Sequence, residues 1–350
     1  MASEPKTRKK RASKSVERKA PAKGKVKSKV KDTVVIDVNP DISNMEPLSL
    51  NEVHCIDCIE GLKRMPSTSV DVLVCDPPYN IGKDFGNQSD KQEQGDYLAW
   101  CEEWIRESYR VMKPSGLCYI FGFSETLSLI HANMVLNGNY KWRVRWLVWH
   151  YTNKTRPTLN FWQRTHESVL CCYFPPTCAF NRDLVREPYG EEFLNNYPGK
   201  TRASTPGRIN HRNITTVYTA HPNGALPRDV IKIPALSGAY GKRERVDHPS
   251  QKPLELCEKL IQSGINVGNP EATVVVAPFA GAGTELVAAK KLNCRYIGFE
   301  INETYVALCN ERLANIEQAI LETSYKSQMA LEAKQAKLTG SASSSPLAKK

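Results

Sequence analysis

Short apolar runs alternate with longer amphipathic stretches along most of the chain. Apolar runs of strand length cover residues 71–75, 117–121, 273–276 and 295–299, each bounded by turn-forming or polar residues. Helical patterns cover Asp96–Met112, which ends at Lys113-Pro114-Ser115-Gly116, and residues 285–292 and 304–321, the last expected on the opposite layer of the fold. Strands separated by helix-length patterns predict an α/β fold with a doubly wound, mostly parallel sheet.

This alternation stops between residues 175 and 247. The stretch is rich in proline and glycine and has little periodicity. A segment of this length without regular structure usually has a function of its own. We therefore expect a folded domain over residues 46–322, with an irregular inserted module over 175–247 at the carboxyl edge of the sheet.

Both ends of the chain have the composition of disordered segments. Residues 1–45 form a predicted basic tail, and 323–350 hold the end of a helix and a second tail. The first 31 residues contain 13 Lys or Arg and two acidic residues, an excess that equals the formal net charge of +11 of the whole chain. Such a tail favours binding to nucleic-acid phosphates, a nuclear localisation signal at Lys9-Lys10-Arg11, or a solubilising role.

The 350-residue composition excludes several classes of protein. The chain has no apolar run of about 18 residues and begins without a secretory signal pattern, which predicts an intracellular protein. Its 11 cysteines are scattered and odd in number, which is typical of reduced thiols. Only His54-Cys55 and Cys58 have a metal-like spacing, and no second pair follows, so we expect no metal site.

The first candidate for catalysis is Asp76-Pro77-Pro78-Tyr79, directly after a strand. The lone pair of an exocyclic amine on a nucleobase is delocalised into the ring, so this nitrogen is a poor nucleophile. A carboxylate and the carbonyl of Pro77 can each accept one amine hydrogen bond and favour a pyramidal nitrogen. The prolines stiffen the turn, and Tyr79 offers a flat surface for an extruded base.

Two further motifs are typical of cofactor binding. Phe279, Gly281, Gly283 and Thr284 belong to a glycine turn between a strand and a helix, and Glu300 ends the following strand, 19 residues after Gly281. An acid at this place can bind both ribose hydroxyls of an adenosine cofactor. His248-Pro249-Ser250-Gln251-Lys252-Pro253 precedes a helix, and Ser250 and Lys252 could hold the cofactor's carboxylate.

The order of these motifs resembles the β-class S-adenosylmethionine-dependent DNA amino-methyltransferases. The resemblance runs from about His54 to Leu313, and the segment from Phe180 to Tyr189 is similar to adenine-specific members that accompany restriction systems. It implies a Rossmann-like seven-stranded sheet, S-adenosylmethionine as cofactor with Asp57 near its adenine and His248 in the site, and a homodimer as one option. One residue departs from the family: Ala277 stands where members usually have an acid that contacts the methionine amine.

The resemblance implies site-specific methylation of the N6 amine of a flipped adenine in duplex DNA, by a protein located on DNA in a nucleoid or nucleus. N4-cytosine methylation stays open, because both amines present the same local chemistry. A non-catalytic DNA-binding or chromatin-like protein with a decayed cofactor site is the alternative outside enzymes. Candidate DNA contacts in the module are basic and amide side chains without an acidic neighbour, at Lys200, Arg202, Arg208, Asn210 and Arg212.

Overall fold

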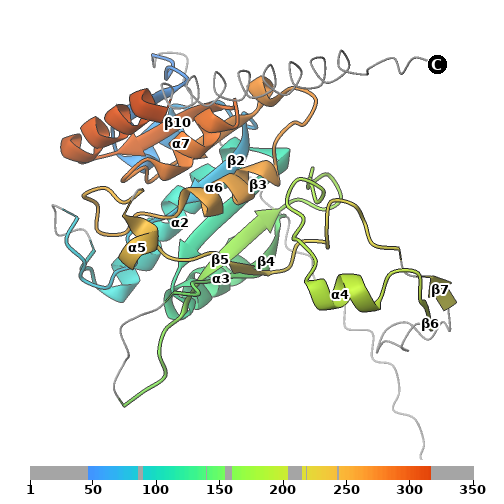
Figure 1. The fold of residues 1–350 in the computed structure, drawn as a ribbon. Coiled ribbons are helices and arrows are strands. Elements are labelled where there is room, and N and C mark those ends of the chain that lie inside the picture. The colour runs from blue at the N-terminus through green and yellow to red at the C-terminus, as the bar shows by residue number, and fades with distance from the viewer. Residues whose placement is uncertain are drawn as a thin grey trace, which may run out of the picture. The chain divides into compact units, whose positions relative to one another are not determined.

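The computed structural model describes residues 46–85, 90–138, 140–153, 160–203, 215–217, 219–242 and 244–316. Its central feature is an eight-stranded sheet in the order β1-β10-β9-β2-β3-β5-β4-β8 (Figure 1). The strands are β1 (Glu52–Cys55), β2 (Val70–Cys75), β3 (Met112–Gly122), β4 (Arg143–His150), β5 (His166–Tyr173), β8 (Val230–Lys232), β9 (Val274–Ala277) and β10 (Arg295–Glu300). Every neighbouring pair is parallel except the two pairs that β5 forms with β3 and β4. The doubly wound α/β fold is confirmed, and the three-residue edge strand β8 is one more strand than the expected seven.

Helices cover both faces of the sheet and enclose two cores. On one face, α1 (Cys58–Lys63), α2 (Gln94–Val111) and α3 (Ser124–Leu136) pack over a core that includes Leu73, Trp104 and Phe299. On the other face, α6 (Leu254–Gln262) and α7 (Thr284–Lys291) pack over a core that includes Val72, Tyr119 and Leu286. Alternate residues of β2 supply both cores, because successive side chains of a strand point to opposite faces. Residues 270–272 add one 3-10 turn ahead of β9.

The last helix of the described chain, over residues 303–316, lies on the same face as α6 and α7. Its Cys309 and Leu313 are buried in the core that contains Leu286. The expectation that this helix lies on the opposite layer is therefore wrong. Residues 317–321, the predicted end of the helix, lie outside the described residues.

Two other expectations differ from the structure. The helix α2 ends at Val111, next to the predicted stop, but the following strand β3 begins at Met112 and not at Leu117, so Lys113 to Gly116 belong to the strand. Lys113 pairs there with Asp71 of β2 at 2.7 Å. The inserted module does not leave from the carboxyl edge. β5 runs antiparallel, so Tyr173 lies beside Leu117 and Arg143 at the amino edge, and Ala179 donates to the Ser115 carbonyl there.

The described part of the module contains some regular structure. It includes α4 (Glu191–Asn196), the two-stranded sheet of β6 (Thr201–Ala203) and β7 (Thr215–Val217), and α5 (Gly238–Gly241). Figure 1 shows α4, β6 and β7 at the end of the sheet away from α5. The chain then returns along β8, which pairs with β4, and reaches the carboxyl edge again. The end of the module is therefore integrated into the main sheet.

Two helical glycines provide a matched test of the packing between α1 and the sheet. A Cβ atom on Gly61 of α1 would lie 2.7 Å from the ring of Phe299 in β10, whereas a Cβ on Gly95 of α2 would meet nothing within 4 Å. We expect Gly61→Ala to lower the free energy of unfolding by about 1–3 kcal/mol through overpacking. Gly95→Ala should leave it unchanged or raise it by up to about 1 kcal/mol, since alanine has the higher helix propensity. Urea unfolding of both variants checks this, and equal effects would contradict the close packing at Gly61.

Candidate active site

The predicted motifs meet at the carboxyl edge of three neighbouring strands. Asp76 follows β2, the glycine turn follows β9, and Glu300 is the last residue of β10. These strands lie side by side in the order β10-β9-β2, although Asp76 and Glu300 are far apart in the sequence. Residues 248–252 come to the same edge because α6, which follows them, packs against α7. Parallel strands of an open α/β sheet place ligand sites at this edge.

The turn after β9 requires glycine at two positions. Gly281 and Gly283 have φ angles of +48° and +71°, in the left-handed region. A Cβ on Gly281 would lie 2.9 Å from Nε2 of His248, and one on Gly283 would lie 2.7 Å from Sγ of Cys309. The Gly281 amide donates to Oε2 of Glu300 at 2.8 Å. The turn and the acid of the next strand therefore form one rigid unit.

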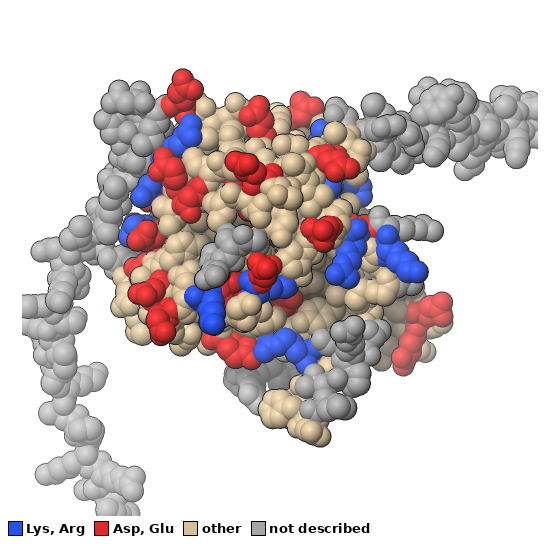
Figure 2. All heavy atoms as spheres, turned by 90° about the vertical axis from the view of Figure 1, so that its left-hand side faces the viewer, with Lys and Arg blue, Asp and Glu red and all other residues tan. Residues whose placement is uncertain are grey.

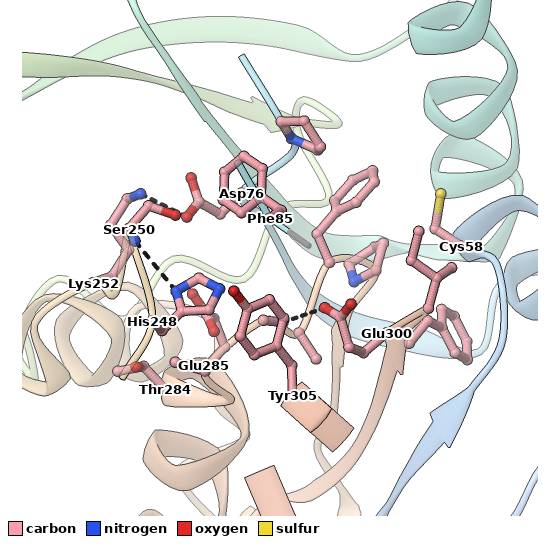
Figure 3. A pocket seen from close by; sticks show the side chains of 18 of the residues that line it. Cys58, Asp76, Phe85, His248, Ser250, Lys252, Thr284, Glu285, Glu300 and Tyr305 are labelled. Atoms are coloured by element: carbon pink, nitrogen blue, oxygen red, sulfur yellow. Dashed lines mark hydrogen bonds and ion pairs between the residues drawn. The ribbon is translucent and has the colours of Figure 1, made fainter. Parts of the chain in front are cut away.

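A cavity of about 190 Å³ opens above this unit (Figure 3). All but one of the residues predicted to bind the cofactor line it: Asp57, His248, Ser250, Lys252, Phe279, Gly281, Thr284 and Glu300. Gly283 does not line the cavity and instead caps the amino end of α7. Apolar side chains such as Ile56 and Phe299 complete the wall. Asp57 caps α1 by accepting from the amides of Ile59 and Glu60.

A second and larger cavity, of about 680 Å³, contains the predicted catalytic motif. Its wall includes Asp76, Pro77 and Tyr79. Aromatic rings surround the motif: Phe123 lies edge-on to Tyr79 with ring centroids 5.1 Å apart, and Trp149 and Tyr151 line the same space. Pro78 faces the first cavity, and its carbonyl accepts a hydrogen bond of 2.8 Å from the Tyr97 hydroxyl. This bond fixes the motif to α2.

Both cavities share Asp76, Phe85, His248, Ser250, Gln251 and Lys252 in their walls. A molecule in one cavity and a molecule in the other would thus meet at Asp76. This geometry suits the transfer of a group between two bound ligands, with Asp76 at the point of transfer.

Asp76 belongs to a partly buried network of four side chains. The Lys252 ammonium lies 2.6 Å from Oδ2 of Asp76 and 3.5 Å from Oε2 of Glu167. The Tyr79 hydroxyl lies 2.7 Å from Oδ1 of Asp76 and 3.0 Å from Oε2 of Glu167. Lys252 is only 4% exposed, so its charge depends on these two carboxylates. The expected contact of Lys252 with a cofactor carboxylate stays a prediction, because here the ammonium points to Asp76 and Glu167.

The network raises the pKa values of two of its members, Lys252 and Tyr79. Burial alone would lower the pKa of Lys252, but Asp76 and Glu167 raise it above its ordinary value, so the ammonium stays charged. Burial, together with the same two carboxylates, raises the pKa of Tyr79 well above its usual range. The tyrosine hydroxyl therefore keeps its proton and acts as a hydrogen-bond donor to the carboxylates of Asp76 and Glu167.

Sequence reasoning missed three acidic residues of the site. Glu167 is the second residue of the buried strand β5, and Glu285 stands among buried residues in the first turn of α7. Asp90, 1% exposed, accepts from the amides of Asn80 and Lys83 and so fixes the turn after Tyr79. An acid within an otherwise apolar stretch was the available signal for the first two. No such sequence signal marked Asp90, because the backbone amides that it accepts from lie in a loop.

The predicted DNA contacts of the module are only partly described. Lys200 is exposed after α4, and Arg202 lies on β6. Arg208, Asn210 and Arg212 lie outside the described residues. Within the described ranges, no group of three or more His, Cys, Asp or Glu side chains could hold a metal ion. No helix there has both the length and the apolar character that crossing a bilayer requires.

Comparison with known proteins identifies the family. The family model described as DNA methylase matches residues 70–311, more than half of the chain. The chain is 30% identical over 259 residues to the type II methyltransferase M.HpaI of Haemophilus parainfluenzae, covering 74% of this chain and 73% of that protein. It is 29% identical over 261 residues to the DNA adenine methyltransferase YhdJ of Escherichia coli strain K12, covering 73% and 80%.

A solved structure agrees with the fold. The structure of the PvuII DNA methyltransferase, named as cytosine-N4-specific, matches with a TM-score of 0.54 at 16% sequence identity, over 79% of this chain and 94% of that one. The chain belongs to the DNA methylase family. It is an S-adenosylmethionine-dependent DNA methyltransferase, and the resemblance found in its motifs is confirmed.

The pKa of His248 gives this site a testable pH dependence. Burial lowers the pKa of this imidazole from 6.5 to about 4, and the ring packs edge-on against Tyr305 with centroids 4.6 Å apart. Between these two values the unfolded state binds the proton and the folded state does not, so His248 reduces stability as the pH falls below 6.5.

We expect wild-type protein to lose up to about 3 kcal/mol relative to His248→Asn as the pH falls from 6.5 to 4. Asparagine keeps an acceptor for the Ser250 amide, which lies 3.3 Å from Nδ1 of His248. Urea unfolding at several pH values measures the difference. A difference that does not change with pH would contradict the assignment.

Proposed function

We propose that this protein transfers a methyl group from S-adenosylmethionine to the N6 amine of an adenine extruded from duplex DNA. The observation that carries the proposal is the meeting of the two cavities at Asp76. The first cavity has the glycine turn, the acid and the apolar wall that an adenosine cofactor needs. The second has the aromatic wall and the paired acceptors that an extruded base needs.

The residues of the first cavity fit the cofactor. Glu300 is fixed by the amides of Gly281 and Asn302, and its carboxylate can accept from the ribose hydroxyls. Ile56, Phe279 and Phe299 offer apolar surface for the adenine, and Asp57 lies among them. Bound in this way, the cofactor supplies an electrophilic methyl group on a sulfonium. Asp57, Phe279, Gly281, Gly283, Thr284, Glu300, His248, Ser250 and Lys252 remain our proposed cofactor residues.

The residues around Asp76 can prepare the amine for attack. The carboxylate of Asp76 and the carbonyl of Pro77 each accept one amine hydrogen bond, which draws the nitrogen toward a pyramidal geometry. Lys252 holds the Asp76 carboxylate in place, since its ammonium lies 2.6 Å from Oδ2. Asp76 is thus an acceptor both before transfer and while the nitrogen loses its proton. Tyr79 and the rings of Phe123 and Trp149 provide surfaces against which the base can stack.

Adenine is favoured over cytosine as the target. The catalytic motif begins with Asp76, and the relative YhdJ is named as an adenine methyltransferase. Methylation of cytosine N4 is the second candidate, because the fold also matches a methyltransferase named as cytosine-N4-specific. A binding protein without activity is less favoured, since the network of Asp76, Tyr79, Glu167 and Lys252 is complete.

Labelled methyl transfer tests the function directly. We expect duplex DNA incubated with the protein and deuterated-methyl S-adenosylmethionine to yield labelled N6-methyladenine in mass spectrometry of digested nucleosides. Asp76→Ala should lower the rate by about 10²–10⁴-fold, because the amine loses a positioned acceptor, while DNA affinity persists. Labelled N4-methylcytosine would instead show that the protein is an active methyltransferase whose target base is cytosine. Comparable turnover in the variant would overturn the role of Asp76.

We also propose how the protein holds duplex DNA. Figure 2 looks onto the catalytic edge and shows Lys and Arg side chains around a hollow in the lower half of the view, with acidic side chains prominent in the upper half. Lys83 and Arg245 are among the residues that line the cavity containing Tyr79. Lys200, Arg202, Arg208, Asn210 and Arg212 remain candidate contacts of the module. The basic tail would add phosphate contacts that carry no sequence information, which would keep the protein on DNA.

The tail can be tested through salt. Deleting residues 1–32 should reduce the dependence of DNA affinity on salt, by about 0.9 in the log–log slope for each phosphate that the tail had neutralised. Preference for the target site should stay the same. A variant with the 13 tail Lys and Arg replaced by Gln keeps the length and removes the charge, so it serves as the matched control. Fluorescence anisotropy over a salt series measures both, and an unchanged slope would reject the role.

A further inference from the structure

Glu285 is a buried carboxylate for which the proposed reaction has no use. It is 4% exposed, belongs to the first turn of α7, and lines the cofactor cavity. Its hydrogen-bond partner among the described side chains is the thiol of Cys257, with Sγ 3.8 Å from Oε1. A thiol is a weak donor, and the residue's own backbone amide is the other hydrogen-bond donor to this carboxylate, so neither partner brings a positive charge. An ionised carboxylate at this depth normally has a cation as partner.

The cations near Glu285 are engaged elsewhere. Lys252 points to Asp76 and Glu167, at 2.6 and 3.5 Å. Arg312, from the helix over 303–316, donates to the Ala282 carbonyl and to the Thr284 hydroxyl. Within the described part of the chain, the Glu285 carboxylate forms no ion pair with a basic side chain within 4.0 Å. The missing counter-charge must therefore come from a ligand or a proton.

The position of Glu285 in the cavity indicates which part of the cofactor it meets. Figure 3 shows Glu285 on the same side of the cavity as Lys252, His248 and Thr284, with Glu300 on the opposite side. If Glu300 holds the ribose, the amino-acid end of the cofactor lies toward Glu285. That end carries an ammonium. The strand end that leads into this turn offers Ala277, which has no charge.

We propose that Glu285 binds the ammonium of the cofactor's methionine moiety and takes the role for which Ala277 has no acid. This inference rests on the proposed placement of S-adenosylmethionine in the cavity. Glu285 is thus a binding residue for the cofactor, and it orients the amino-acid end so that the methyl group faces Asp76.

The protonation of Glu285 agrees with an empty cation site. Burial, and then the negative charge of Asp76, raises its pKa from 4.5 to about 7, against the opposing effect of Lys252 and Arg312. The ionisable groups of the described chain that act on Glu285 are Asp76, Lys252 and Arg312, together with the thiols of Cys257 and Cys309. A cation bound beside the carboxylate would lower its pKa, so cofactor binding should release a proton.

Calorimetric binding to the full-length protein tests the assignment without measuring activity. The probes are S-adenosylmethionine and its analogue with hydrogen in place of the amino group. Glu285→Gln should lower the affinity for S-adenosylmethionine by about 30-fold or more and change the affinity for the analogue by less than about threefold. Glu300→Gln is the matched control, and it should weaken both ligands equally because it acts on the ribose. Equal losses of both ligands in Glu285→Gln, or unchanged affinity for S-adenosylmethionine, would overturn the assignment.

Proton release from the wild-type protein gives a second measurement that needs no variant. Titrations at pH 6.5, in buffers of different ionisation enthalpy, should show release of about three quarters of a proton with S-adenosylmethionine, because Glu285 with a pKa of about 7 is mostly protonated at this pH. The ligand amine, with its pKa of about 7.7–8.0, is already charged. The analogue should release none. Equal release with both ligands would reject the role of Glu285. Failure of the wild type to bind either ligand would instead reject the proposed cofactor site.

Discussion

The ion pair of Lys252 with Asp76 and Glu167 is the interaction on which the catalytic edge depends. A buried ammonium needs carboxylate partners, and these two come from the ends of β2 and β5, while Lys252 precedes α6. One side chain thus connects three elements that are distant in sequence. Its ammonium also holds the Asp76 carboxylate in place, 2.6 Å from Oδ2.

The same edge explains how two ligands can approach each other. β10, β9 and β2 are neighbours, so the glycine turn that we propose binds adenosine and the Asp76 motif lie next to each other in one row. The aromatic cavity lies on the far side of Asp76, toward β5 and β4, which contribute Glu167 and Trp149. Strand order alone therefore separates the proposed cofactor cavity from the proposed substrate cavity. Only a few side chains, such as Ser250 and His248, need to serve both.

The elements that could be predicted from sequence are those whose pattern is local. β2, β9 and β10 are continuous apolar runs because both faces of the sheet are covered, and their observed ends fall within about two residues of the predicted ones. Asp76, Gly281 and Glu300 could be found because strand ends in this fold hold ligands. The direction of β5 could not be predicted, since an apolar run carries no information on its partner. Because β5 runs antiparallel to β3, the module leaves from the amino edge of the sheet. The expectation that it lies at the carboxyl edge was therefore wrong.

Glu167 and Glu285 were missed for a related reason. Each is an acid inside an apolar element, and only the folded structure brings Lys252 or a cavity next to it. Contacts in the folded structure thus decide whether such an acid pairs with a cation or keeps its proton.

Glu285 and His248 also oppose each other in the dependence of stability on pH. The folded state keeps the Glu285 proton between about pH 4.5 and 7, while the unfolded state has lost it, so stability falls as the pH rises through this range. His248 has the opposite effect between about pH 4 and 6.5, where stability rises with pH. The two contributions offset each other over most of this range in the free protein. A cation bound at Glu285 would remove the first contribution and leave the second. The summed contribution of these two groups to stability should then rise with pH in the cofactor-bound protein and stay nearly flat in the free protein, which connects ligand charge to their ionisation.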